Sequence, residues 1–328
     1  GLMASLPLVD VGELAAGHPT ALKGIYEACR EVGTVLLSGV APDLCAMPVA
    51  LARRFFALDV RAKQCMDIGR SRHFRGFSVM HNERDWREQV HFGRERPARA
   101  PGEAWGRLDG PNLWPGDCEL RAGVIDLLRR AEDVGSLLLR AIARSMGARC
   151  DTFLAAGDDA YTLMKFICYH AQTDDATSRR GVAAHCDFSW LTLLFQDPVG
   201  GLQVMDREGR WIDVPAVPDL VAVNVGELLQ FATSGDLFAA PHRVVNPSRS
   251  RDRLSVPVFI NPPLAYEVRR IDNHKHRAPP APWLETEHVH RVLTRSQILD
   301  RGVQSLHFGH AEWRRKGENI WCSACCAA

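Results

Sequence analysis

Two histidines and one aspartate are the side chains of this sequence best suited to holding a metal ion. His185 and Asp187 stand two positions apart, and His242 follows in a later segment. The stretch 182–196 is rich in apolar, aromatic and β-branched residues, which predicts a strand. Alternate residues of a strand point to one face, so His185 and Asp187 can converge on one ion. A β-barrel can bring a distant strand with His242 alongside them.

This set of ligands indicates a particular kind of metal chemistry. Two imidazoles and one carboxylate on one side of a metal leave the other side open, which is typical of non-heme iron(II) oxygenases. A single His-x-Asp is weak evidence, because a chain with 13 His and 39 acidic residues contains such pairs by chance. A strand histidine is also commonly a structural, hydrogen-bonded residue. Companion residues are needed to decide.

Arg253 and Ser255 are such companions, because they lie two positions apart in a strongly β-like run, 253–260. Both side chains can therefore face the same cavity. An arginine offers a planar fork of donors that matches a carboxylate, and a serine hydroxyl adds another hydrogen bond. A buried arginine among apolar residues needs an anionic partner. That partner is either an internal acid or a bound ligand, and the order His-x-Asp, His, Arg-x-Ser favours a ligand.

With these motifs in place, the chain resembles the iron(II)- and 2-oxoglutarate-dependent oxygenases of the isopenicillin N synthase-like branch. The resemblance covers most of the sequence. The matching segments are 6–10, 28–40, 52–58 with Lys63, 74–78, 86–88, 191–197, 200–204 and 224–230, all ahead of His242.

The resemblance implies a role for each motif residue. His185, Asp187 and His242 would bind iron(II), and Arg253 and Ser255 would bind the distal carboxylate of 2-oxoglutarate. Tyr169 stands where relatives often carry a tyrosine that helps to hold the cosubstrate, although Ile167 replaces the usual asparagine. The implied reaction uses O2 to oxidise, most simply to hydroxylate, a C–H bond of a small molecule, with succinate and CO2 as coproducts. Asp187 fills the place that family halogenases leave to chloride, which argues against halogenation.

Three alternatives stay open at this point. The chain could be an oxidase like isopenicillin N synthase, in which Arg253 and Ser255 hold the substrate's own carboxylate and no 2-oxoglutarate is used. The segments 233–242 and 306–309 faintly resemble the ethylene-forming enzymes, which fragment 2-oxoglutarate itself. A non-catalytic β-barrel binding protein is the third alternative, and the intact metal and arginine motifs weigh against it.

Substrate identity is the least constrained part of the prediction. Polar contacts from Arg75 or Glu88 would favour an amino acid or a tailored natural product over a bare terpene or flavonoid. About half of the candidates are expected to be ordinary core residues. The candidate pocket residues are Arg75, Phe77, Glu88, Phe92, Phe188, Trp190, Phe238 and Phe259.

Periodicity predicts a mainly β protein with a helical N-terminal part, in which α-helices flank a double-stranded β-helix (jelly-roll) core. Apolar spacing indicates helices over 19–33, 43–58 and 119–146, and 70–117 is expected to be irregular. Residues 1–328 are expected to form one catalytic unit. Its parts are a helical and irregular region 1–117, a long helix within 118–160, the jelly-roll core 161–265 and a C-terminal extension 266–328.

Composition fits a globular enzyme, with 46% hydrophobic and 24% charged residues among 328. The net charge of +1 gives no electrostatic reason to expect nucleic acid or an anionic membrane as a partner. No apolar run approaches the roughly 18 residues of a membrane span. No signal-peptide pattern is present, so a cytoplasmic location is expected, and the oligomeric state is left open.

Cysteine and histidine clusters near the C-terminus have simpler explanations than metal binding. Cys322, Cys325 and Cys326 are three of ten cysteines, and a structural zinc site usually needs four ligands. Reduced, exposed thiols are therefore expected there. His274 and His276 lie in a basic run without a third ligand and are expected in a solvated loop.

Overall fold

The computed structural model describes residues 6–82, 85–155, 159–171, 181–245, 248, 250–271, 289–294, 297 and 302–318. Its centre is a large sheet of eight strands, in the order β1-β2-β10-β7-β12-β5-β4-β3. All its neighbouring pairs are antiparallel except β1–β2. The strands are β1 (Leu8–Asp10), β2 (Thr34–Ser38), β3 (Gly76–His81), β4 (Trp86–Gly93), β5 (Leu163–Tyr169), β7 (Leu191–Gln196), β10 (Val221–Val225) and β12 (Arg253–Ile260).

A smaller sheet with the order β6-β11-β8-β9 packs on one face of the large sheet. One cluster of buried side chains joins them, with Ile167 and Leu194 from the large sheet and Leu202, Val204 and Val244 from the small side. A two-stranded sheet, β13–β14, completes the β structure in the described part of the chain. These strands are β6 (Val182–His185), β8 (Leu202–Met205), β9 (Trp211–Asp213), β11 (His242–Val244), β13 (Glu267–Arg269) and β14 (Ser305–His307).

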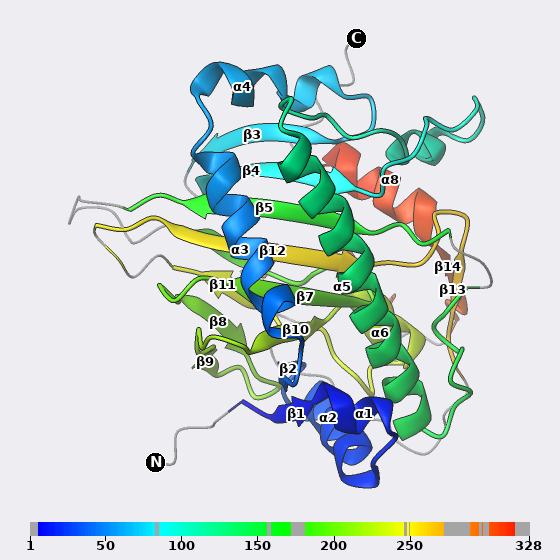
Figure 1. Ribbon diagram of the computed structural model, residues 1–328. Coiled ribbons are helices and arrows are strands. Elements are labelled where there is room, and N and C mark those ends of the chain that lie inside the picture. The colour runs from blue at the N-terminus through cyan, green and yellow to red at the C-terminus, as the bar shows by residue number, and fades with distance from the viewer. Residues whose placement is uncertain are drawn as a thin grey trace.

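Two long helices, α3 and α5, lie across the other face of the large sheet (Figure 1). Asp117 caps α5 by accepting a hydrogen bond from the Leu120 backbone N–H, and prolines begin α2 and α3, where a missing N–H costs nothing. The helices are α1 (Val11–Ala15), α2 (Pro19–Glu31), α3 (Pro42–Phe56), α4 (Val60–Cys65), α5 (Cys118–Ser145), α6 (Glu227–Ala232) and α8 (Phe308–Glu318), with 3-10 turns η1 (Ile68–Arg70) and η2 (Ala104–Leu108).

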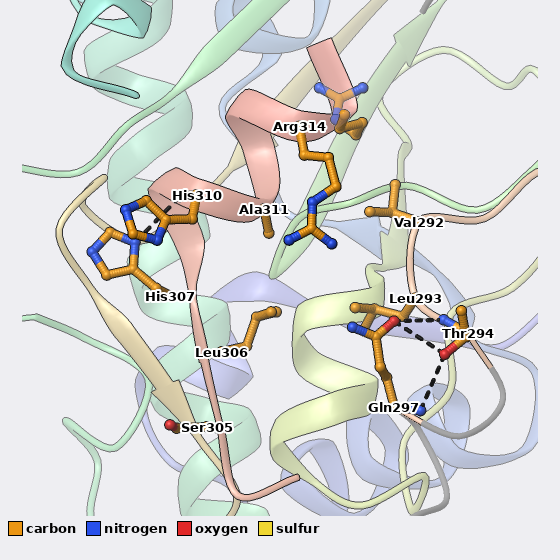
Figure 2. A pocket seen from close by; sticks show the side chains of 11 residues that line it. Val292, Leu293, Thr294, Gln297, Ser305, Leu306, His307, His310, Ala311 and Arg314 are labelled. Carbon is orange, nitrogen blue, oxygen red and sulfur yellow. Dashed lines mark hydrogen bonds between the residues drawn. The ribbon is translucent and has the colours of Figure 1, made fainter. Parts of the chain in front are cut away.

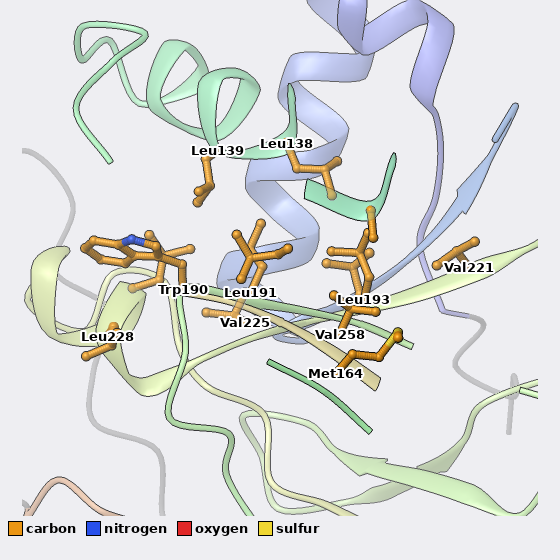
Figure 3. Close-up of a cluster of buried hydrophobic side chains, with 14 of the residues drawn as sticks. Leu138, Leu139, Met164, Trp190, Leu191, Leu193, Val221, Val225, Leu228 and Val258 are labelled. Carbon is orange, nitrogen blue, oxygen red and sulfur yellow. The ribbon is translucent and has the colours of Figure 1, made fainter. Parts of the chain in front are cut away.

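Strand alternation divides the side chains of the large sheet between two environments. Met164, Leu193 and Val258 point toward the helices and pack beneath Leu138 and Leu139 of α5 (Figure 3). Residues of opposite parity point toward the small sheet, which leaves the interior between the two sheets as the place where polar strand residues can meet. The large apolar core therefore lies on the helix side and supports a second, partly polar interior.

The predicted jelly-roll core with flanking helices is confirmed, and α2, α3 and α5 begin and end within two residues of the predicted helices. Two predictions were wrong. Residues 182–196 are not one strand, because the chain leaves the small sheet after His185 and enters the large sheet at Leu191. The region 70–117 is not irregular throughout, because β3 and β4 extend the large sheet. Polar residues facing the interior obscured the β pattern of β4.

The predicted histidine and cysteine clusters near the C-terminus lie outside the described residues. They comprise His274, His276, Cys322, Cys325 and Cys326. In the part of the chain that the structure describes, no helix combines the length and apolar character required to cross a membrane.

Candidate active site

The three predicted metal ligands come together between the two sheets. His185 ends β6 and His242 begins β11, and these two residues pair directly across the strands. Their imidazole centroids are 4.3 Å apart. The Asp187 Oδ1 atom lies 3.7 Å from His185 Nε2 and 3.5 Å from His242 Nε2. One donor atom from each residue therefore lies within 4.8 Å of the others.

Hydrogen bonds leave the metal-binding atoms of both histidines free. His185 Nδ1 donates to the Ala183 carbonyl at 2.9 Å, and His242 Nδ1 donates to the Ala240 carbonyl at 3.2 Å. A neutral imidazole that donates from Nδ1 carries its lone pair on Nε2, which is the usual arrangement behind a metal-bound histidine. The Asp187 Oδ2 atom is buried and has no hydrogen-bond partner among the described residues. These donors fit a divalent metal ion.

The protonation states also suit a cation. Burial, with His242 next to it, lowers the pKa of His185 to about 3, so its ring is neutral at physiological pH. Burial opposes ionisation of Asp187, but neighbouring groups, His242 first among them, outweigh it and the pKa of this carboxyl falls below its usual value. His185 keeps 26% of its side-chain surface exposed, whereas Asp187 keeps 6%. The cluster is therefore accessible from the His185 side.

Asp187 reaches its position from a loop and not from a strand. It lies two residues past the end of β6, and its carbonyl accepts a hydrogen bond from the Glu227 backbone N–H at 2.8 Å. Gly226 donates to the Trp190 carbonyl at 2.9 Å, which fixes the start of α6 against the same loop. A Cβ atom at Gly226 would collide with the Ser189 carbonyl. The Asp187 loop thus depends on a close backbone approach that only glycine permits here.

Gly226→Ala should therefore weaken both the fold and the metal site. Overpacking against a backbone carbonyl typically costs about 1–3 kcal/mol of unfolding free energy, and the loop that carries Asp187 must move to relieve it. Denaturant unfolding of the metal-free protein and iron affinity measure the two effects. Gly102→Ala is the matched control, because the nearest atom to its Cβ would be the Ala100 oxygen at 4.0 Å. Equal behaviour of the two variants would contradict this account of the loop.

Arg253 lies on the interior face of β12 and is fully buried. Its Nη2 donates to Gln196 Oε1 at 3.0 Å and its Nε donates to the Gly200 carbonyl, while Nη1 is buried without a partner among the described residues. Burial lowers the pKa of Arg253, against the favourable effect of nearby Tyr169 and Asp197. No carboxylate of the described chain forms an ion pair with it. An orphaned guanidinium N–H in this setting fits an anionic ligand.

Tyr169 and Ser255 share the interior with Arg253. Tyr169 is the direct cross-strand partner of Arg253, and the guanidinium carbon is 5.1 Å from the centre of its ring. Ser255 is buried two residues along the same face of β12. All six residues predicted for iron and 2-oxoglutarate thus belong to the interior between the two sheets, five of them on strands and Asp187 on the loop after β6.

Most of the predicted pocket residues lie elsewhere. Phe77 and Phe92 belong to the core on the helix side, where both pack against Phe55 of α3. Glu88 also points away from the interior and pairs with Lys63 at 3.3 Å. These three side chains have the opposite strand parity to the interior residues, so they do not line the site.

The remaining candidates divide between core and interior. Phe188 stacks on Phe308 of α8, and Trp190 packs against Phe153. Phe238 lies beneath the Arg207 guanidinium at 4.4 Å. Phe259 and Arg75 do face the interior. The Phe259 ring contacts Lys165 of β5, and the Arg75 guanidinium lies against Gly93 of β4.

His91 and Lys165, two polar residues on the interior face, were not predicted from the sequence. They oppose each other on β4 and β5. The available signal was strand alternation: Lys165 stands two and four positions before Ile167 and Tyr169 in an otherwise apolar run.

A second group of potential ligands lies on the outer side of β4 and β5. Glu88, Cys168 and His170 place donor atoms within 4.8 Å of one another. Lys63 already pairs with Glu88, and Asp252 accepts a hydrogen bond from His170 Nδ1 at 3.3 Å. Burial, followed by the charges of Asp252 and Glu88, raises the pKa of the Cys168 thiol above its usual range. These contacts describe an ion-pair network that is satisfied without a metal.

A cavity of about 430 Å³ lies between α8, β14 and the residues Val292, Leu293, Thr294 and Gln297 (Figure 2). Figure 2 shows Arg314 and Ala311 of α8 directed toward the side of Val292 and Leu293. Val292 and Leu293 form the wall of the cavity opposite α8. The Glu227 carboxylate fixes this wall by accepting hydrogen bonds from the Val292 and Leu293 backbone N–H groups at 2.9 and 3.0 Å. This volume is in the range of small-molecule sites.

Comparison with known proteins identifies the class to which this fold and site belong. Residues 161–262 match the 2OG-Fe(II) oxygenase superfamily, and residues 6–117 match the N-terminal region of non-haem dioxygenases of morphine synthesis. The chain belongs to the 2OG-Fe(II) oxygenase superfamily. It is therefore an oxidoreductase that uses iron(II), 2-oxoglutarate and O2.

Individual relatives are similar over most of their length. The 2-oxoglutarate-Fe(II) type oxidoreductase hxnY of Emericella nidulans is 28% identical, over 78% of this chain and 79% of its own. The homoarginine-6-hydroxylase 2-ODD-C23 of Glycine max is 27% identical, over 84% and 91%. A solved 2OG-Fe(II) oxygenase family protein from Caulobacter crescentus has a TM-score of 0.77 at 25% identity, with coverage of 96% and 99%.

Proposed function

We propose that this protein hydroxylates a C–H bond of a small molecule, with His185, Asp187 and His242 as the iron ligands and Arg253, Ser255 and Tyr169 as the 2-oxoglutarate site. The observation that carries the proposal is that a cluster of metal donors and a buried cation share one interior. Three metal-donor atoms lie within 4.8 Å of one another, and the buried Arg253 guanidinium has an N–H group with no hydrogen-bond partner among the described residues.

Bound iron(II) and 2-oxoglutarate would supply O2 activation, with oxidative decarboxylation of the keto acid to succinate and CO2. The protein's own residues would bind the metal and the cosubstrate, orient them, and exclude water from the site. The Ala183 and Ala240 carbonyls orient the two imidazoles, and Gln196 orients Arg253. The apolar cluster between the sheets excludes water from the charged groups, which strengthens their interactions.

The same observations support a single catalytic unit over residues 1–328. Strands β1 to β4, which precede residue 117, complete the large sheet that carries the interior face of β5, β7 and β12. The boundaries predicted at residues 117, 160 and 265 then separate regions of one enzyme and not independent domains. Removal of the N-terminal part would expose both edges of this sheet.

Partners and location follow from charge and thiol chemistry. A net charge of +1 supports a small-molecule substrate and no nucleic-acid or membrane partner. Cys65, Cys118 and Cys150 are exposed and unbridged, which suits the reducing cytoplasm.

A mass balance under 18O2 tests the reaction type. With a true substrate, we expect equal amounts of succinate and hydroxylated product, with one labelled oxygen atom in each. Oxygen consumption without succinate would replace this proposal with an oxidase reaction, and ethylene release would replace it with fragmentation of 2-oxoglutarate. A desaturated product with no incorporated oxygen would also contradict hydroxylation.

A further inference from the structure

A group of basic side chains lies on the interior face of the large sheet, away from Arg253. His91 and Lys165 are direct cross-strand partners on β4 and β5, so their side chains share one face. Lys165, Ile167 and Tyr169 alternate along β5, and Tyr169 opposes Arg253. His91 and Lys165 therefore face the same interior as the proposed 2-oxoglutarate anchor.

This basic group is also connected to the candidate iron site. Lys165 Nζ lies 5.4 Å from the centre of the Phe259 ring, and Phe259 opposes Thr192 on β7. The Thr192 hydroxyl lies 3.2 Å from the hydroxyl of Ser189, which belongs to the loop that carries Asp187. Phe259 and Thr192 therefore connect Lys165 to the loop of the candidate iron site.

Arg75 adds a second cation beside His91. Its side chain is 1% exposed, and a Cβ atom at Gly93, two residues after His91, would collide with the guanidinium. Arg75 Nη1 donates to the His73 carbonyl at 2.9 Å and reaches the Tyr161 hydroxyl at 3.5 Å. Its Nε is buried with no partner in the described part of the chain.

Within the described residues these cations form no ion pair of their own, although the charge of the buried Glu312 carboxylate reaches Lys165. Arg315 is bound by Glu312 at 2.6 Å and Arg87 by Asp85 at 3.1 Å, but neither Lys165 nor Arg75 forms an ion pair there. Both ring nitrogens of His91 are buried without a hydrogen-bond partner. Burial and the surrounding cations hold the pKa of Lys165 well below its usual value. Such an arrangement is costly unless an anion completes it.

We propose that Lys165, His91 and Arg75 bind a carboxylate group of the substrate. The inference rests on the proposed hydroxylase function and adds the chemical class of its substrate. A bound carboxylate favours the charged form of Lys165, so Lys165 provides the charge, His91 a ring N–H and Arg75 its free Nε–H. The three residues therefore offer donors that match carboxylate oxygens. The two acids whose charges reach Lys165 are both engaged in this assignment, because Asp187 binds the metal and Glu312 is bound by Arg315 at 2.6 Å.

This subsite is separate from the proposed 2-oxoglutarate anchor. Lys165 stands four residues from Tyr169, which corresponds to about 13 Å along a strand at about 3.3 Å per residue. The two carboxylate sites would lie toward opposite ends of β5. One would hold the cosubstrate and the other the substrate.

Pairs of small carboxylic acids and their primary amides test the assignment. Each compound is titrated by calorimetry into anaerobic protein loaded with iron(II) and 2-oxoglutarate, and succinate release is then measured in air. We expect the acids that bind to bind roughly 10- to 100-fold more tightly than their amides, as for loss of a charge-assisted hydrogen bond. Lys165→Met should remove this preference, and Lys165→Arg should retain most of it. Lys23→Met, at an exposed position, should behave like the wild type.

Two results would overturn the proposal. The first is a wild-type protein that binds no acid of the panel more tightly than its amide. The second is a Lys165→Met protein that keeps the acid preference, or that loses affinity for 2-oxoglutarate and not for the acids. Failure of the proposed function would look different, because the wild-type protein would then show no 2-oxoglutarate binding before any acid is added.

Discussion

His242→Ala is expected to abolish stoichiometric iron(II) binding while the protein stays folded. The variant removes one of three donors whose atoms lie within 4.8 Å of one another. The side chain otherwise makes one hydrogen bond, from Nδ1 to the Ala240 carbonyl, so little structural support is lost. Metal content after anaerobic loading and circular dichroism measure the two properties, and 2-oxoglutarate turnover should disappear with the iron.

His18→Ala is the control for loss of an imidazole. His18 is exposed and precedes α2 without a side-chain capping hydrogen bond. It should bind iron like the wild type. One iron per chain in His242→Ala would refute the proposed ligand set, whereas an unfolded variant would show that His242 has a structural role that the hydrogen bonds do not account for.

Arg253→Ala should weaken 2-oxoglutarate binding by about 1.5–3 kcal/mol, the typical worth of hydrogen bonds to charged groups. Arg253 is the buried cation of β12, and its unpartnered Nη1 offers a donor to the distal carboxylate. Iron affinity should be nearly unchanged, because the iron ligands lie on β6, β11 and the loop after β6. Calorimetry with 2-oxoglutarate and with iron(II) separates the two effects.

Two further variants sharpen this prediction. Arg253→Lys keeps the charge and loses the planar fork, so its affinity for 2-oxoglutarate should fall between those of the wild type and Arg253→Ala. Arg61→Ala removes an exposed arginine and should have no effect. Unchanged 2-oxoglutarate affinity in Arg253→Ala would mean that another group anchors the cosubstrate.

Strand alternation in the sequence predicted one half of the candidate site for the right reason and the other half for the wrong one. Arg253 and Ser255 do share a face of β12, as strand alternation requires. The alternation argument failed for His185 and Asp187, because Asp187 lies beyond the end of β6. Their convergence depends instead on the backbone contact between Asp187 and Glu227, two residues far apart in sequence. The sequence contains no local signal for such a contact.

Strand parity explains which pocket residues could not be predicted. Phe77, Glu88 and Phe92 look like cavity residues by composition, but their register places them on the side of α3 and α5. The same register turns His91 and Lys165 inward. The sequence did not identify β3 and β4 as strands of the large sheet. Residue type alone therefore could not separate the residues that face the helices from those that face the interior. Topology, more than composition, therefore decided the substrate side of the site.

The most direct test of the account is an anaerobic titration of the iron(II)-loaded protein with 2-oxoglutarate. The measurement follows the weak visible charge-transfer band of a keto acid chelated to iron. We expect a saturable band that requires both iron and 2-oxoglutarate, because the ligand set and Arg253 share one interior. Iron bound at one equivalent with no such band at any 2-oxoglutarate concentration would contradict the proposed site.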